Sequence, residues 1–409
     1  FMKIVIIGGV AGGASAAARA RRLNESADII IFERGAYISF ANCGLPYHIG
    51  QTIQQRDKLL VQTPEAMKAR FNIDVRIKSE VVSIDRKAKE LLIRDLEQKR
   101  EYRQSYDKLI LSPGAEPVVP NIPGINLKNV FTLRSMNDMD NIKSVVDAAK
   151  GSRALIVGGG YIGLEMAEAL KNRKMDVTLV EMANQVFGVL DAEMTSVLNA
   201  ELKIHGVDLR LGTSVAAIEE GTNGLHVRLY NGDTVDCSFV LMSIGVKPES
   251  KLAKDAGLTI GSRGGITVNE YMQTNDPDIY AVGDASEADD FVGGFKTFIP
   301  LAGPANRQGR IAADNIVGGS KVKYGKTQGT AICKVFDLAV GMTGLSEKSL
   351  KRIGRPYEKI YVHPASHASY YPGASQISLK LIFDPNDGKI LGAQAVGLDG
   401  IDKRIDVIS

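Results

Sequence analysis

The sequence contains no tryptophan, and its 12 phenylalanines and 13 tyrosines are few for 409 residues. So few aromatic side chains argue against a platform that stacks the bases of single-stranded nucleic acid. The charge is nearly balanced, because 50 Lys and Arg residues stand against 47 Asp and Glu residues. A net charge of +3, dispersed along the chain, predicts neither nucleic acid nor a membrane surface as a partner.

Long apolar runs are also missing. None reaches the roughly 18 residues of a membrane-spanning helix, and the apolar residues 4–7 lead straight into glycines, which favours a buried strand over a signal peptide. The three cysteines, Cys43, Cys237 and Cys333, are scattered and odd in number. They exclude a disulfide framework and favour a reducing, cytoplasmic location. No His or Cys cluster has the spacing of metal ligands, so no metal site is expected.

What the sequence does contain is an internal repeat. Residues 3–35 and 153–183 each read as a short apolar run, a glycine turn, an alanine-rich amphipathic helix, a second apolar run and a glutamate. This pattern predicts two strand–helix–strand units with buried parallel strands, and hence an α/β fold. The 409 residues are enough for two to three domains, and a hydrophobic content of 44% is enough to give each domain its own core.

The two glycine turns predict two dinucleotide sites. A pyrophosphate needs backbone N–H groups at a helix N-terminus and a turn tight enough for close approach, and a distal glutamate accepts ribose hydroxyls. In the first copy Val10 stands at the middle glycine position, so either the register shifts to Gly9 and Gly12 or the phosphates lie slightly farther away. The matching residues are Gly158, Gly160, Gly163 and Glu181 in the second copy, and Gly8, Gly13 and Glu33 in the first.

The glutamate of the second copy also predicts the choice of nucleotide. A carboxylate at Glu181 favours a free 2′-hydroxyl and repels a 2′-phosphate. Residues 182–184, Met-Ala-Asn, supply no cation. We therefore expect NADH to be preferred over NADPH.

A later segment suggests that the other nucleotide is a flavin. Residues 278–282 form a short apolar strand that ends in Gly283-Asp284. An aspartate at such a strand end is suited to the ribityl hydroxyls of a flavin. The alternative is a turn aspartate that caps a local N–H.

Six segments of the sequence stand out, in order along the chain: GGVAGG (8–13), SFANCGLPY (39–47), GGGYIGLE (158–165), YAVGDA (280–285), HASYYPGA (367–374) and DGIDKRIDV (399–407). The first four resemble motifs of the flavin- and pyridine-nucleotide-dependent disulfide reductases. The single-cysteine motif SFANCGLPY and the two C-terminal segments resemble the coenzyme A-disulfide reductase branch, especially the form fused to a rhodanese domain and described as an NADH-dependent persulfide reductase.

The resemblance implies two Rossmann-like dinucleotide-binding domains and an α+β C-terminal dimerisation domain. Residues 1–113 and 245–325 would form the FAD-binding domain, 114–244 the NADH-binding domain and 326–409 the dimerisation domain. Relatives continue beyond the position of Ser409. We therefore expect a homodimer whose dimerisation domain is incomplete here, with a possible C-terminal rhodanese domain in the full-length chain.

The resemblance also implies ligand contacts. Coenzyme A would be a bound substrate or a mixed disulfide, and Ser15, Arg19 and Arg22 follow one helix face, which could bind its phosphates or be a solvated basic face. Expected FAD contacts are Gly8, Gly9, Val10, Ala11, Gly12, Gly13, Glu33, Arg34, Asn42 and Asp284. Expected NADH contacts are Gly158, Gly160, Tyr161, Ile162, Gly163, Glu165, Glu181 and Gly245. Expected coenzyme A contacts are Ser15, Arg19, Arg22, Ser39, Asn42, Phe71, Asn306 and Arg307.

Cys43 is the candidate redox-active residue, whereas Cys237 and Cys333 are expected to be buried structural cysteines. Pro46 suits the first turn of a helix, which would place the sulfur near a helix N-terminus and lower the thiol pKa. With no second cysteine nearby, Cys43 can be oxidised to a mixed disulfide, a sulfenic acid or a persulfide. The expected enzyme reduces coenzyme A disulfide, or coenzyme A persulfide or polysulfide, with NAD(P)H and FAD.

Two other functions remain open: an NADH oxidase, and a non-catalytic flavin redox sensor. Ala11 replaces the histidine that flavin peroxidases of the broad family carry in this turn, which argues against a dedicated peroxidase. Tyr370 and Tyr371 are candidate acids or orienting hydroxyls, one of them expected at Cys43 of the opposite subunit. Alternatively they are a hydrophobic pair at a corner before a Pro-Gly turn.

Overall fold

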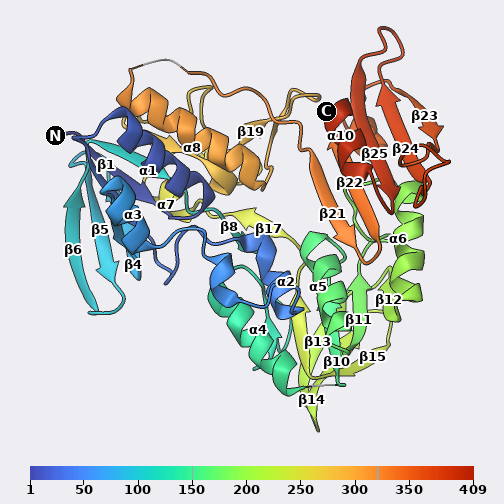
Figure 1. Cartoon of the computed structure of the whole chain (residues 1–409). Coiled ribbons are helices and arrows are strands. Elements are labelled where there is room, and N and C mark those ends of the chain that lie inside the picture. The colour runs from blue at the N-terminus through green and yellow to red at the C-terminus, as the bar shows by residue number, and fades with distance from the viewer. Residues whose placement is uncertain (150, 320–321) are drawn as a thin grey trace.

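A computed structural model describes residues 1–149, 151–319 and 322–409. Three five-stranded sheets organise the described part of the chain. Figure 1 shows how the elements are arranged around them. The first sheet has the order β18-β7-β1-β2-β3, and every strand pair in it is parallel. The first region and its return segment contain β1 (Lys3–Ile7), α1 (Ala11–Leu23), β2 (Asp28–Phe32), η1 (Asn42–Gly44), α2 (Leu45–Ile49), η2 (Arg56–Leu59), α3 (Pro64–Phe71), β3 (Asp74–Arg76), β4 (Ser79–Asp85), β5 (Glu90–Asp95), β6 (Arg100–Ser105), β7 (Lys108–Leu111), β17 (Val246–Pro248), α7 (Lys251–Asp255), β18 (Ile279–Ala281), η3 (Gly283–Ala285), β19 (Ala288–Asp289), β20 (Lys296–Thr297) and α8 (Ala302–Val317).

The second sheet lies between these two stretches of sequence. Its order is β12-β11-β10-β16-β9, again with parallel pairs only. The antiparallel pair of β8 and β17 connects the second region to the first. The second region contains β8 (Ala115–Pro117), β9 (Val130–Phe131), α4 (Met136–Ala148), β10 (Arg153–Val157), α5 (Tyr161–Asn172), β11 (Asp176–Glu181), α6 (Ala192–Ile204), β12 (Val207–Leu211), β13 (Val215–Gly221), β14 (Gly224–Leu229), β15 (Thr234–Cys237) and β16 (Phe239–Met242).

The C-terminal sheet is antiparallel, with the order β21-β22-β25-β24-β23. It lies beside α6 of the second region (Figure 1). The predicted fold class, two Rossmann-like domains followed by an α+β domain, is confirmed. We retain the domain boundaries as a proposal. The C-terminal region contains β21 (Ala331–Val335), β22 (Leu338–Gly344), α9 (Glu347–Arg352), β23 (Glu358–Val362), β24 (Ile377–Phe383), β25 (Ile390–Gly397) and α10 (Ile401–Ile408).

Both predicted repeat units form as expected, as β1-α1-β2 and β10-α5-β11. Residues 4–7 and 154–157 are buried, because helices or strands cover both faces of each parallel sheet. None of the helices within the described ranges has both the length and the apolar character needed to cross a bilayer.

The glycine turns of the two copies share one register. Gly8 and Gly158 have φ of +94° and +107°, and a Cβ at either position would collide with a backbone oxygen of the neighbouring strand end. A Cβ on Gly13 would lie 1.9 Å from the carbonyl oxygen of Gly8. A Cβ on Gly163 would lie at the same distance from the carbonyl oxygen of Gly158. Gly8 and Gly13 therefore correspond to Gly158 and Gly163. The motif of the first copy does not shift to Gly9 and Gly12, and Val10 occupies its middle glycine position.

The contact between α1 and α8 yields a stability prediction. A Cβ on Gly309 of α8 would lie 2.2 Å from the carbonyl oxygen of Gly12 in α1. We expect Gly309→Ala to lower the free energy of unfolding by about 2 kcal/mol, because neither backbone can move without disturbing the other. Gly303→Ala, on the same helix with open space around it, is the matched control and should raise stability by up to about 1 kcal/mol. Urea unfolding measures both; equal effects would refute the close packing.

Candidate functional site

A cavity of 2230 Å³ brings the two glycine turns, the cysteine motif and Asp284 together. Residues of the C-terminal hairpin β21–β22, including Ile332 and Met342, complete its wall. The predicted site residues that line it are Gly8, Val10, Ala11, Gly12, Ser15, Glu33, Arg34, Ser39, Asn42, Cys43, Gly158, Gly160, Tyr161, Ile162, Glu165, Glu181, Gly245, Asp284 and Asn306. Gly9, Gly13 and Gly163 lie behind the lining and shape the turns.

The distal glutamates are fixed in the same way in both copies. Glu33 accepts hydrogen bonds from the N–H groups of Gly9 (3.0 Å) and Gly35 (2.7 Å). Glu181 accepts them from Gly159 (2.7 Å) and Ala183 (2.8 Å). Each carboxylate oxygen keeps a further lone pair with which it can accept a hydrogen bond from a ligand hydroxyl.

Asp284 lies in η3, directly after β18. None of the hydrogen bonds found among the described residues involves its carboxylate, so it does not cap a local N–H and that alternative is wrong. Burial raises the pKa of Asp284 to about 6. A half-buried carboxylate directed into a cavity without a protein donor fits a polyol chain that supplies hydroxyl donors.

Cys43 lies in η1, and α2 follows it with Pro46 in the first turn, as predicted. Its side chain is exposed and faces the cavity, whereas Cys237 and Cys333 are buried. The expected lowering of the thiol pKa is wrong. Although the residue is exposed to the cavity, partial desolvation there raises the pKa of Cys43, and the negative charge of Glu165 raises it further. A five-residue helix has too small a dipole to overcome these effects.

Sequence reasoning missed Tyr47, four residues after Cys43. Its hydroxyl donates to Glu165 Oε1 at 3.2 Å, and both side chains line the cavity with Cys43. Burial raises the pKa of Glu165 to about 7, although the hydrogen bond from Tyr47 opposes this. A carboxyl group whose pKa is raised in this way therefore lies next to the candidate nucleophile.

Glu165→Gln should lower the pKa of Cys43. Above about pH 7 the carboxylate of Glu165 is ionised and disfavours a neighbouring thiolate, so its removal should favour the thiolate. We expect the rate of alkylation by iodoacetamide at pH 8 to increase several-fold and its pH profile to move to lower pH. The Cys43→Ser variant gives the background rate. An unchanged or higher midpoint would contradict this electrostatic coupling.

The expected coenzyme A contacts are only partly brought together. Ser15 Oγ donates to Asn306 Oδ1 at 2.8 Å, and both line the cavity. Arg19 is instead paired with Asp314 at 2.7 Å. Ser39 and Asn42 also line the cavity, whereas Arg22, Phe71 and Arg307 do not. The guanidinium of Arg22 lies over the Phe71 ring at 5.6 Å.

Tyr370 and Tyr371 do not reach the cavity of their own chain. Their exposed fractions are 90% and 66%, so they do not form a buried hydrophobic pair in this chain. The ring of Tyr371 contacts His367 edge to face at 5.8 Å. That one of these tyrosines reaches Cys43 of a partner subunit stays a prediction.

Two nucleotide-binding turns that face one accessible cysteine define a class: flavin- and pyridine-nucleotide-dependent oxidoreductases that act through sulfur. The family model described as pyridine nucleotide-disulphide oxidoreductase matches residues 2–309, and the model of that family's dimerisation domain matches residues 330–409. The chain belongs to the pyridine nucleotide-disulphide oxidoreductase family. Membership implies FAD and NAD(P)H, and the cradles around Gly8 and Gly158, where a Cβ would collide, fit both.

The chain is similar over its whole length to several known proteins. The coenzyme A disulfide reductase of Staphylococcus haemolyticus is 35% identical over 407 residues, which cover 100% of this chain and 90% of that protein. The structure of reduced CoADR-RHD from Bacillus anthracis is 54% identical with a TM-score of 0.97, covering 99% of this chain and 73% of that one. An NAD-dependent persulfide reductase from A. fulgidus is 37% identical with a TM-score of 0.96, covering 100% and 76%.

Proposed function

We propose that this protein uses NAD(P)H, with NADH preferred, to reduce coenzyme A disulfide, or coenzyme A persulfide or polysulfide, through Cys43. The observation that carries the proposal is the exposed thiol of Cys43 in a cavity that both glycine turns also line. The names of the similar proteins, a coenzyme A disulfide reductase and a persulfide reductase, support the choice of substrate.

Cys43 is the nucleophile of the proposed reaction. Its thiolate attacks one sulfur of the substrate disulfide, the S–S bond breaks, and coenzyme A leaves as a thiolate that takes up a proton. A mixed disulfide between Cys43 and the second coenzyme A remains, and two electrons return Cys43 to the thiolate and release that coenzyme A. Bound FAD supplies the two-electron transfer that connects NADH to sulfur. One NADH and one proton are consumed for every two thiols released, or for one thiol and one hydrogen sulfide from a persulfide.

Glu165 and Tyr47 hold a proton beside Cys43 in this scheme. Because the pKa of Glu165 is about 7, a protonated Glu165 bonded to Tyr47 can supply the proton that a departing thiolate needs. The proposed homodimer adds one of the partner's exposed tyrosines, equivalent to Tyr370 or Tyr371, to the same step. The free cysteines, two of them buried, suit the reducing cytoplasm that we propose as its location.

The remaining predicted residues take the roles that the resemblance implies. Glu33, Asp284 and the first glycine turn, with Arg34 and Asn42, hold FAD. Glu181, Tyr161, Ile162, Gly245 and the second glycine turn hold NADH. Ser15, Ser39, Asn42 and Asn306, which line the cavity, contact coenzyme A in this scheme. Contacts from Arg19, Arg22, Phe71 and Arg307, which do not line the cavity, stay a prediction of the resemblance.

An anaerobic assay of stoichiometry tests the proposed function. With coenzyme A disulfide as the acceptor, the holoenzyme should release two thiols for each NADH oxidised, and with the persulfide it should release hydrogen sulfide. An NADH oxidase would instead consume NADH at full rate in air without any sulfur substrate. A redox sensor would bind FAD but turn over neither substrate.

A further inference from the structure

We propose that Lys380 is a positioning residue for the nicotinamide nucleotide. Lys380 belongs to the C-terminal domain, and its ion pairs hold loop 182–190 and helix α6 in place. In this way it sets the affinity of the site for NADH. The inference rests on the proposed NADH site, because this loop follows Glu181 directly. Figure 1 shows α6, in green, beside the orange and red C-terminal sheet. Lys380 lies on strand β24 of this sheet.

Lys380 is a completely buried cation. The exposed fraction of its side chain is 0%, and its Nζ donates to Asp191 Oδ2 at 2.8 Å and to Glu193 Oε1 at 2.5 Å. It also donates to the buried carboxylate of Glu347. A buried ammonium is tolerated only when such partners surround it, so this contact fixes the start of α6 with little freedom to shift.

Asp191 joins the loop to this network. It stands between loop 182–190 and α6, and its N–H donates to Gln394 Oε1 at 3.0 Å. Its carboxylate accepts from Gln394 Nε2 at 2.8 Å and from the N–H of Glu347 at 3.1 Å. The C-terminal end of the loop is therefore attached to β24, β25 and α9 at once.

The middle of the loop has a second attachment. Lys348 Nζ donates to the carbonyl oxygen of Gly188 at 2.8 Å and to Gln185 Oε1 at 3.4 Å. Gln185 and Gly188 line the cavity together with Glu181. The loop thus forms part of the wall of the nucleotide site on one side and bonds to the C-terminal domain on the other.

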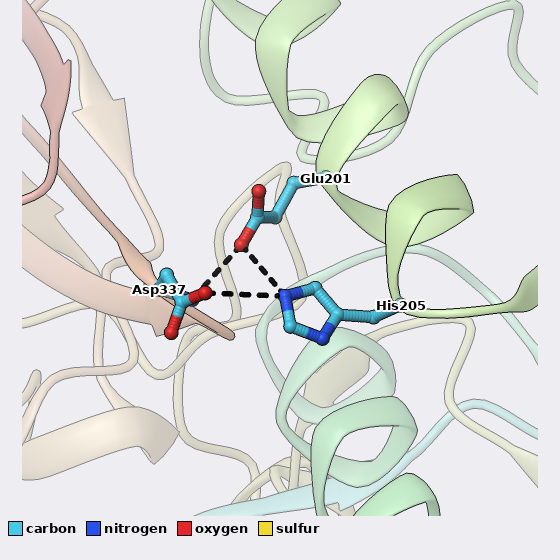
Figure 2. A group of neighbouring side chains, drawn as sticks. All are labelled: Glu201, His205 and Asp337. Atoms are coloured by element: carbon cyan, nitrogen blue, oxygen red, sulfur yellow. Dashed lines mark hydrogen bonds and ion pairs between the residues drawn. The ribbon is translucent and has the colours of Figure 1, made fainter.

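The far end of α6 is held as well, as Figure 2 shows. His205 Nε2 lies 3.1 Å from Glu201 Oε1 and 3.4 Å from Asp337 Oδ2, and the N–H of Asp337 donates to Glu201 at 3.0 Å. The His205 ring stacks on Phe336 with centroids 4.2 Å apart. These groups satisfy one another, so we interpret them as the second anchor of α6 rather than as a metal site.

A combined variant separates positioning from stability. Lys380→Met alone leaves the buried carboxylate of Asp191 without a cation, so it is expected to destabilise the protein. Adding Asp191→Asn removes that unpaired negative charge and should restore much of the stability. If Lys380 only stabilises the fold, the double variant should bind NADH as the wild type does. If it positions the loop, nucleotide binding should remain weak.

The experiment measures the holoenzyme of K380M/D191N, the milder K348A and the control K359M. Lys359 also bonds to Glu347, at 2.7 Å, but its side chain is partly exposed and none of the bonds found for it reaches Asp191 or the loop. We expect the KM for NADH and the Kd for NAD⁺ to rise about tenfold in K380M/D191N and about threefold in K348A. The kcat should stay within twofold of wild type, and K359M should resemble wild type throughout.

Values of KM and Kd within twofold of wild type in K348A, or in a folded K380M/D191N, would overturn the inference. Since K348A changes a side chain at the surface, it gives a result even if the double variant does not fold. A wild-type holoenzyme that binds no NAD⁺ and oxidises no NADH would instead refute the proposed function, so the two failures are distinguishable.

Discussion

Cys43→Ser is expected to lower the rate of NADH-dependent reduction of coenzyme A disulfide by about 10⁴-fold or more. A serine hydroxyl cannot form the mixed disulfide, so no path for two electrons to the substrate remains. FAD content should not change, because the glycine turns and Asp284 are intact. Reduction of ferricyanide by NADH should persist, because that reaction needs only the nucleotide sites.

Cys333→Ser is the matched control for this variant. Cys333 is 3% exposed and packs in the core between α5 and the C-terminal sheet, so its substitution should leave the turnover of disulfide close to wild type. If Cys43→Ser retained a tenth or more of the disulfide reductase activity, sulfur chemistry at Cys43 would be ruled out as the route. A loss in Cys333→Ser alone would move the redox role to the buried thiol.

The second large effect concerns the choice of nucleotide. Combining Glu181→Ser with Met182→Arg should lower the ratio of kcat/KM for NADH to kcat/KM for NADPH by about 10²-fold, or roughly 2.7 kcal/mol. The change removes the carboxylate that repels a 2′-phosphate and adds a guanidinium that binds it. Met182 is 77% exposed at the cavity wall, so an arginine fits there without displacing the core.

Steady-state kinetics with both nucleotides measures this ratio, and Met182→Ala is the control for the loss of the methionine alone. We expect Met182→Ala to leave the ratio within about threefold of wild type. A wild-type enzyme that already prefers NADPH would contradict the role of Glu181. So would a double variant whose ratio is unchanged.

Local patterns explain why much of the fold could be predicted from the sequence. The repeat units need only apolar strands, glycine turns and amphipathic helices, and each of these signals lies within about 30 residues of chain. The steric role of Gly8 and Gly13 follows from the same local geometry. The accessible cysteine could also be predicted, since its neighbours Gly44 and Pro46 are typical of a turn that begins a helix.

Contacts between distant segments explain what could not be predicted. The pKa of Cys43 is raised by desolvation in the cavity and by the negative charges of Glu165 and Asp284, all of which depend on tertiary folding and oppose the expected effect of the short helix α2. The pairing of Arg19 with Asp314 likewise joins α1 to α8, and the sequence alone gives no sign of it. The buried charge of Lys380 depends on Asp191 and Glu347 from two other elements.

Mass spectrometry of the unreduced protein, after incubation with coenzyme A disulfide and removal of free ligand, tests the central claim most directly. We predict an adduct of the mass of coenzyme A on the peptide that contains Cys43. It should disappear after addition of NADH and be absent from Cys43→Ser. A Cys43 peptide that carries an unmodified thiol under these oxidising conditions would contradict the account.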